Sequence, residues 1–142
     1  MSIQIHEMTM DFYPQVIALW SATEGVGLSA TDDQQNIASY LVRNPGMSFI
    51  AQDGEQLVGT VLCGHDGRRG YIHHLAVAGP YRRHGIGKEL VTRCLGALKA
   101  VEIDKCHLFV FAGNLEAQAF WKSSGWSHRT DLVVMSGYTD KN

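Results

Sequence analysis

The stretch that decides the fold is Tyr71–Lys88, YIHHLAVAGPYRRHGIGK. It begins with apolar residues typical of a buried strand, passes through a Gly-Pro turn and an arginine pair, and opens into a helical pattern. A glycine-rich turn between a strand and a helix N-terminus binds phosphate well, because the first-turn N–H groups are unpaired and glycine lets the backbone approach the anion. The segment Arg82–Lys88 is therefore predicted to hold an anionic cofactor.

Size and composition are those of an ordinary globular protein. The chain has 142 residues, of which 45% are hydrophobic and 18% charged, and its formal net charge is −2. This length suits one domain with one core, predicted to cover residues 1–142. The small net charge argues against a general nucleic-acid or membrane-surface binder, and no apolar run reaches the roughly 18–20 residues of a membrane span.

The cysteines and histidines indicate neither disulfides nor a metal site. An odd number of cysteines, each in an apolar segment, favours buried reduced thiols and a cytoplasmic protein, as does an N-terminus without the pattern of a signal peptide. The seven histidines show no HxxxH spacing and the cysteines show no CxxC spacing, so no metal site is predicted. The three cysteines are Cys63, Cys94 and Cys106.

Working upstream, the sequence predicts a short strand, two helices and an antiparallel meander. The first strand spans Ile3–Met8, a helix capped by Thr9 follows, and residues 21–30 form a glycine-containing loop. A second helix starts at the capping box Thr31–Gln34 and stops before Pro45. Short apolar segments separated by Asp-Gly turns then predict three strands, at 47–52, 57–64 and 71–77.

Downstream, helices alternate with strands. A helix starts at Ile86, a strand spans His107–Phe111, and a second helix spans Asn114–Ser124 with Gly125 as its C-cap. The last predicted strand is Leu132–Met135. The fold class is therefore α/β with α+β character, a mixed central sheet with an antiparallel N-terminal meander and flanking helices.

Three features of the chain resemble the GNAT superfamily of acetyl-CoA-dependent N-acetyltransferases, and the resemblance covers nearly its whole length. Arg82–Gly87 is similar to the family's Gln/Arg-x-x-Gly-x-Gly/Ala pyrophosphate motif, and it follows the strand Leu75–Val77 and a Pro-Tyr-Arg turn, as in many members. Asn114-x-x-Ala-x-x-Phe-Trp121, followed by Gly-Trp, is similar to the family's Asn-x-x-Ala-x-x-Leu-Tyr and Gly-Phe signature. The resemblance implies two splayed central strands with acetyl-CoA between them.

The resemblance also implies where acetyl-CoA binds. Backbone N–H groups around Arg83–Lys88 would hold the pyrophosphate, and the edge of Leu75–Val77 would pair with the amides of the pantetheine arm. Asn114 would contact that arm at the start of its helix. The expected cofactor-binding residues are Leu75, Ala76, Val77, Arg82, Arg83, His84, Gly85, Ile86, Gly87, Lys88, Asn114, Phe120 and Trp121.

Amine acetylation needs an uncharged amine, and His73 is the first candidate for the base. Strand alternation predicts that it shares a face with Leu75 and Val77 near the thioester, whereas His74 points the other way and is structural. The position of His73 resembles a strand histidine in the arylalkylamine acetyltransferase branch of the family; a histidine without a catalytic role is the alternative. Glu24 would bind or deprotonate the amine, unless it is a solvated loop charge. A backbone N–H near Leu75 would hold the oxyanion.

Trp121 departs from the family pattern, because many members carry a tyrosine there as the acid that protonates the departing thiolate. Indole is no useful acid at neutral pH. Water or another tyrosine, such as Tyr138, would then take this role, or no acid is needed, since a thiol pKa of about 8.5 makes thiolate a tolerable leaving group. A route through acetyl-cysteine ranks behind direct attack, because no cysteine has a histidine-and-acid setting in the sequence.

The sequence thus predicts an N-acetyltransferase in which a primary amine attacks acetyl-CoA directly in a ternary complex. Glu24, Asp32 and Asp33 favour a small cationic amine as acceptor, with protein N-termini and lysines as alternatives. The competing class is a non-catalytic acyl-CoA-binding or sensing module, which Trp121 permits. A dinucleotide-binding fold is a weaker rival, because the first strand lacks GxGxxG. No nucleic-acid or membrane partner is predicted, and a homodimer is left open.

Overall fold

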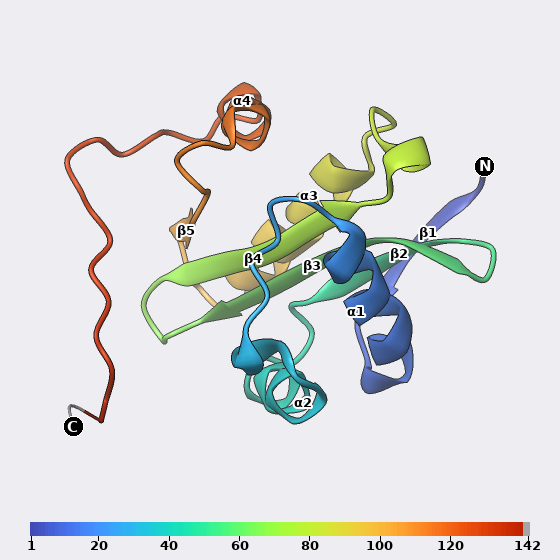
Figure 1. Ribbon diagram of the computed structural model, residues 1–142, viewed down its shortest axis with the longest axis horizontal. Helices are drawn as coiled ribbons and strands as arrows, with labels where there is room; N and C mark the ends of the chain where they lie inside the picture. Colours follow the sequence, from blue (N-terminus) through green and yellow to red (C-terminus); the bar gives the residue numbers. More distant parts are fainter. Residues whose placement is uncertain (141–142) are drawn as a thin grey trace. The chain divides into compact units, whose positions relative to one another are not determined.

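The computed structural model describes residues 1–140 and contains a five-stranded mixed sheet whose strands follow chain order (Figure 1). The first four strands form an antiparallel meander, and the fifth joins the fourth in parallel. The predicted fold class, a mixed sheet with an antiparallel meander and flanking helices, is confirmed. The strands are β1 Ile3–Glu7, β2 Phe49–Asp53, β3 Gln56–His65, β4 Gly70–Val77 and β5 Cys106–Leu108.

The chain forms two compact units, Met1–Phe109 and the part from Val110 onward. The first unit holds the whole sheet and the helices α1 Tyr13–Ala22, α2 Gln34–Arg43 and α3 Ile86–Ala100. The second holds α4 Leu115–Ser123, after which the described chain has no regular structure. That residues 1–142 act as a single domain stays a prediction. Within the described residues, no helix is both long and apolar enough to span a membrane.

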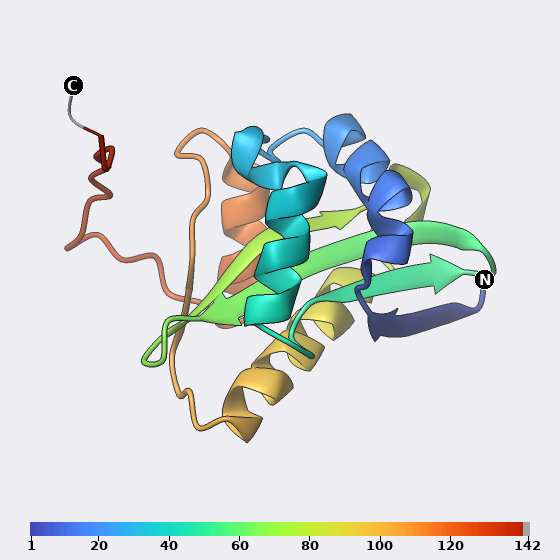
Figure 2. The same ribbon diagram turned by 90° about the horizontal axis from the view of Figure 1, so that it is seen from below.

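The sheet of the first unit is covered on both faces (Figure 2). On one face, side chains from α1 and α2 form a core with the sheet, in which Val16, Trp20 and Ile37 pack with Leu62 and Ala76. On the other face, α3 lies so close that a Cβ on Gly70 would stand 2.5 Å from Leu98 Cδ1. Glycine at this strand position therefore fixes the distance between α3 and the sheet.

A β-bulge interrupts β4 at His74 and Leu75. His73 pairs with Leu62 and Ala76 pairs with Thr60, so two β4 residues oppose a single β3 residue. Since Thr60 and Leu62 are two residues apart on β3, they share a face, and so do their partners His73 and Ala76. The prediction that His73 shares a face with Leu75 and Val77 is therefore wrong, because alternation fails across a bulge.

His74 also departs from its predicted orientation. Its ring lies edge-on to Trp20 of α1, while the His73 ring lies edge-on to Tyr40 of α2. Both helices cover the same face of the sheet (Figure 2). His74 therefore does not point away from the layer that His73 contacts, and its φ of 51° explains how consecutive residues reach one layer.

Several predicted boundaries move, and one predicted strand is absent. The segment Leu132–Met135 has no strand structure and its side chains are largely exposed. A short apolar run becomes a strand only where a neighbouring strand pairs with its backbone, which local sequence does not reveal. The capping box is formed by Ser29 and Asp32 around a 3-10 turn, and Asp33 caps α2. The C-cap of α4 is Ser124, and the predicted C-cap Gly125 follows one position later with a φ of 93°.

Candidate active site

The candidate anion site is the connection between β4 and α3. A 3-10 turn at Gly79–Tyr81 is followed by two residues in the left-handed region, Arg83 with a φ of 67° and Gly85 with a φ of 80°. Gly85 is the N-cap of the 15-residue helix α3 and offers no side-chain cap. The N–H groups of Ile86, Gly87 and Lys88 therefore have no acceptor within the helix and are available to an anion.

Two side-chain hydrogen bonds fix the first part of this connection. The Tyr81 hydroxyl donates to Asp53 Oδ2 at 2.7 Å, and this bond holds the pKa of the Asp53 carboxyl below its usual range. Arg82 Nε donates to the carbonyl of Val77 at 3.0 Å, so the Arg82 guanidinium lies at the end of β4.

The charge at the start of α3 also favours an anion. Arg83, His84 and Lys88 are exposed and lie at or just before the first turn of the helix. The acidic residue of this turn, Glu89, pairs with Arg93 one turn later. Arg83 and Lys88 lie at the positive end of the helix dipole, where a bound anion would be favourable. The predicted pyrophosphate residues are thus brought together by one short connection.

In β4, the strand before this connection, one backbone edge has no partner strand along its second half. The parallel ladder with β5 ends at Ile72 opposite Leu108, whereas the pairing with β3 continues to Val77. Within residues 1–109, the segment 73–77 therefore has no strand partner on its β5 side. The splay between the two strands starts where the bulge lies.

His73 lies among aromatic rings near this splay. Its ring is nearly parallel to that of Tyr71, and the two ring centroids are 6.5 Å apart. The centroid of the His73 ring also lies 6.4 Å from the ring centroids of Phe109 and of Tyr40. Burial lowers the pKa of His73, and neighbouring His74 lowers it further. His73 is therefore neutral at neutral pH and can accept a proton.

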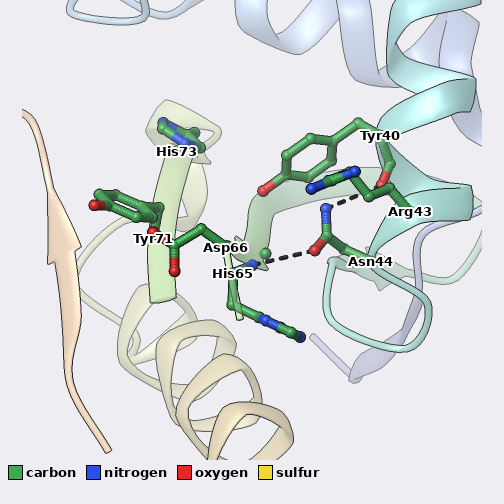
Figure 3. A pocket seen from close by; sticks show the side chains of 8 residues that line it. Tyr40, Arg43, Asn44, His65, Asp66, Tyr71 and His73 are labelled. Atoms are coloured by element: carbon green, nitrogen blue, oxygen red, sulfur yellow. Dashed lines mark hydrogen bonds between the residues drawn. The ribbon is translucent and has the colours of Figure 1, made fainter. Parts of the chain in front are cut away.

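A pocket of about 220 Å³ opens beside His73 (Figure 3). Its volume is below the roughly 300–1,000 Å³ of pockets that enclose whole drug-sized ligands, so it suits a small group. The Tyr40 hydroxyl is buried there with no hydrogen-bond partner, and burial raises the pKa of Tyr40 above its usual range. The lining residues are Tyr40, Arg43, Asn44, Gly64, His65, Asp66, Tyr71 and His73.

Sequence reasoning missed this aromatic wall. Tyr71 precedes His73 by two positions on β4, so strand alternation before the bulge would have found it. Tyr40 comes from α2, and nothing in the local sequence indicates that its ring meets β4.

Of the carboxylates predicted to attract the acceptor amine, Asp32 and Asp33 bind other groups of the protein. Asp32 is buried and pairs with His74, Oδ1 to Nε2 at 2.8 Å, while Asp33 Oδ1 accepts from the N–H of Asn36 at 2.8 Å and caps α2. Glu24 is exposed in the connection between α1 and α2. Two of the three carboxylates expected to attract a cationic amine thus have structural partners.

The second unit contains the remaining predicted residues. Asn114 lies at the start of α4 as expected, and its Oδ1 accepts from the N–H of Ala117 at 3.0 Å. Trp121 lies edge-on to Phe120 and Trp126, with ring centroids 5.1 and 4.9 Å apart. Tyr138 lies in the irregular stretch after α4 and is 90% exposed.

The cysteines offer no ready nucleophile. A hydrogen bond with Cys63, together with burial, raises the pKa of Cys94 far above its usual range, and burial raises the pKa of Cys106 to about 12. These thiols stay protonated at neutral pH, which disfavours an acetyl-cysteine route. Among residues 1–140, no cluster of three or more His, Cys, Asp or Glu side chains could hold a metal ion.

Comparison with known proteins agrees with this geometry. The model of the Acetyltransferase (GNAT) family matches residues 4–126. Acetyltransferase ECA0875 of Pectobacterium atrosepticum is 30% identical over 112 residues, which cover 79% of each chain. Human N-alpha-acetyltransferase 30 is 36% identical over 93 residues, 61% of this chain but only 26% of the human protein.

The fold is shared with a solved structure that holds coenzyme A. The PaiA N-acetyltransferase from Thermoplasma acidophilum, solved in complex with coenzyme A, superposes with a TM-score of 0.76 at 18% identity over 87% of this chain and 89% of that one. From the family match over residues 4–126 and these likenesses, the chain belongs to the GNAT family of acetyltransferases.

Proposed function

We propose that this protein transfers an acetyl group from acetyl-CoA to a primary amine, by direct attack in a ternary complex. The observation that carries the proposal is that the start of α3 and the open edge of β4 lie next to each other in the unit Met1–Phe109. The unpaired N–H groups and cations at the start of α3 directly follow a strand whose edge is open from His73 to Val77. An anion site next to an open strand edge fits a ligand with a pyrophosphate and an amide-bearing arm.

The connection Arg82–Lys88 would bind the pyrophosphate, and Leu75–Val77 would pair with the amides of the arm. Acetyl-CoA, when bound, supplies a thioester carbonyl. The bulge takes His74 and Leu75 out of the regular register with β3. A backbone N–H there would donate to the oxygen that gains negative charge.

His73 would take the proton of the acceptor ammonium and leave the nitrogen lone pair free to attack. Its position next to the splay and its lowered pKa both support this role. When the bond between carbon and sulfur breaks, thiolate leaves without a strong acid, since its pKa is low for a leaving group. Glu24 and Tyr138 are exposed, and their roles stay predictions.

For the acceptor, we favour a small-molecule amine. The pocket beside His73 is small, and the faces of Tyr71 and Tyr40 suit an organic cation or a flat apolar group. The relative named N-alpha-acetyltransferase keeps protein N-termini as the second class of acceptor. The reduced state of the three cysteines fits a cytoplasmic location.

The proposal is tested with the purified chain in two assays. Binding of acetyl-CoA is measured by calorimetry, and release of free thiol is followed with aliphatic amines, polyamines, aminoglycosides and short peptides with free or blocked N-termini. We expect micromolar binding and thiol release with at least one amine class. Binding without thiol release for every acceptor would indicate a non-catalytic acyl-CoA module, and absence of binding would reject both functions.

A further inference from the structure

The backbone of His74 is held in an unfavourable conformation. Its φ of 51° is in the left-handed region, which is uncommon for a residue other than glycine. Such a conformation persists only where the surrounding structure holds it. Both the side chain and the main chain of His74 have partners that do so.

The side chain is held by Asp32, 42 positions away in the chain. His74 Nε2 lies 2.8 Å from Asp32 Oδ1, and the Asp32 side chain is about 9% exposed. The other carboxylate oxygen accepts from the N–H of Ser29 at 3.0 Å, and the Asp32 carbonyl accepts from the Tyr13 hydroxyl at 2.7 Å. The connection between α1 and α2 is thereby fastened to the bulge.

The main chain of His74 is held from the sheet. Its carbonyl accepts from the Thr60 hydroxyl at 3.2 Å, and the same hydroxyl oxygen accepts from Trp20 Nε1 at 2.8 Å. The Trp20 ring lies edge-on to the His74 ring, with centroids 4.8 Å apart. Trp20, Thr60 and His74 therefore each contact the other two. Thr60 and Trp20 are fully buried, which makes each of these hydrogen bonds costly to lose.

We propose that Asp32 and His74 form a clamp that fixes the connection between α1 and α2, and with it the start of α2, against the β4 bulge. Because Tyr40 of α2 lines the pocket beside His73, the clamp thereby positions the acceptor amine for transfer. The inference rests on the proposed function. His74 is then a positioning residue. It acts on the acceptor amine through Asp32, and on the thioester of acetyl-CoA through the backbone of the bulge. Asp32 belongs to this clamp and is not a ligand of the acceptor amine.

The clamp also faces the proposed base. Asp32 raises and His74 lowers the pKa of His73, whose lowering is dominated by burial. The other titratable or charged groups around His73 belong to α2, the end of β3, β4 and β5. They are Tyr40, Arg43, His65, Asp66, Tyr71 and His107.

The test compares Asp32→Asn, His74→Asn and the double variant with two controls outside the clamp, Asp11→Asn and His6→Ala. Acceptor KM, kcat and acetyl-CoA affinity are measured at a temperature where thermal unfolding shows every variant to be folded. We expect kcat/KM for the acceptor to fall by about ten- to a hundredfold in each single clamp variant, as for a misplaced substrate. The double variant should be no worse than either single variant, because both remove one interaction.

The pH profile separates positioning from general damage. Asp32→Asn should move the acidic limb of kcat/KM to lower pH, whereas His74→Asn should move it to higher pH. Acetyl-CoA affinity should fall much less than kcat/KM for the acceptor, because the pyrophosphate residues Arg82–Lys88 belong to a different connection. Additive losses, shifts in the same direction, or acetyl-CoA affinity falling in step with kcat would overturn the proposal.

A second readout needs no turnover. Amide hydrogen exchange over residues 23–33 should become faster in both clamp variants and stay unchanged in both controls. If the wild-type protein transferred acetyl to no amine, the proposed function would fail, and this exchange would still decide the clamp. Unchanged exchange in Asp32→Asn and His74→Asn would overturn it.

Discussion

The hydroxyl of Tyr81 donates a 2.7 Å hydrogen bond to Asp53, which joins the connection before α3 to the turn between β2 and β3. This bond ties a short loop, whose shape depends on two left-handed residues, to the end of β2, a strand that is paired on both sides. It would give the proposed anion site a fixed position before a ligand binds, so that little conformational entropy would be lost on binding.

Removing this bond should weaken acetyl-CoA binding. In Tyr81→Phe the ring stays but the hydroxyl is lost, and the dissociation constant is expected to rise by about three- to tenfold. The pKa of Asp53 should rise toward its ordinary value, since the Tyr81 bond is the largest cause of its depression. Calorimetry and NMR titration of the Asp53 carboxyl measure the two effects. An unchanged dissociation constant in a folded variant would show that the loop does not need this anchor.

Gly85 should be needed for the anion site because of its backbone. It has a φ of 80° and open space around its Cβ position, so Gly85→Val introduces conformational strain and no collision. That strain is of order 1–2 kcal/mol, and relief by rotation would turn the first-turn N–H groups away from the anion. The dissociation constant of acetyl-CoA is expected to rise about tenfold or more.

Gly79 provides the matched control. A Cβ at Gly79 also meets open space, but its φ is not in the left-handed region. Gly79→Ala should therefore bind acetyl-CoA like the wild-type protein. Equal affinities for Gly85→Val and Gly79→Ala would remove Arg82–Lys88 as the pyrophosphate site. The companion variant Gly87→Val is expected to weaken binding in the same direction.

His73 should control the acidic limb of the activity profile. Burial lowers the pKa of His73 from the ordinary 6.5, so kcat/KM should hold its plateau to below pH 6.5 before it falls. His73→Ala should lower kcat by about 10²–10⁴-fold and abolish this limb. A profile of unaltered shape in His73→Ala would show that another group takes the proton.

The same histidine should affect stability with pH. Because its pKa is lower in the folded state, the unfolded chain binds the proton more readily around pH 6.5 and below. Folding stability is therefore expected to be retained above about pH 6.5 and to decline as pH falls through that value. His73→Gln should show a smaller decline between pH 7 and pH 5, measured by urea unfolding at each pH. An equally steep decline would assign it to other groups.

Gly70 should be needed for the packing of α3 on the sheet. A Cβ there would lie 2.5 Å from Leu98 Cδ1, and Leu98 is buried. Gly70→Ala is expected to destabilise the protein by about 1–3 kcal/mol through overpacking. Gly96→Ala, in the middle of α3 with open space at its Cβ position, should instead stabilise it by about 0.5–1 kcal/mol. Chemical denaturation of both variants checks the opposite signs.

The sequence by itself determined the class of fold, and it predicted where an anion would bind. The signals for Arg82–Lys88 are local, since a strand, a turn and a helix N-terminus follow one another within a few residues. The end of α4 before Gly125 is also local, because a helix end depends on the backbone of the adjacent turn. The start of α2 was predicted only approximately, since Asp33 caps it and the expected box Thr31–Gln34 does not form.

Only the tertiary structure decided which groups meet around His73 and His74 on β4. The bulge at His74 places His73 and Val77 on opposite faces of the sheet. Trp20, Asp32 and Thr60, which are distant in the chain, hold this bulge in place. A carboxylate that sequence reasoning assigned to the acceptor is buried against a histidine. The apolar run Leu132–Met135 stayed without a strand. Each outcome depends on which distant segments pack together, and local periodicity carries no information about that choice.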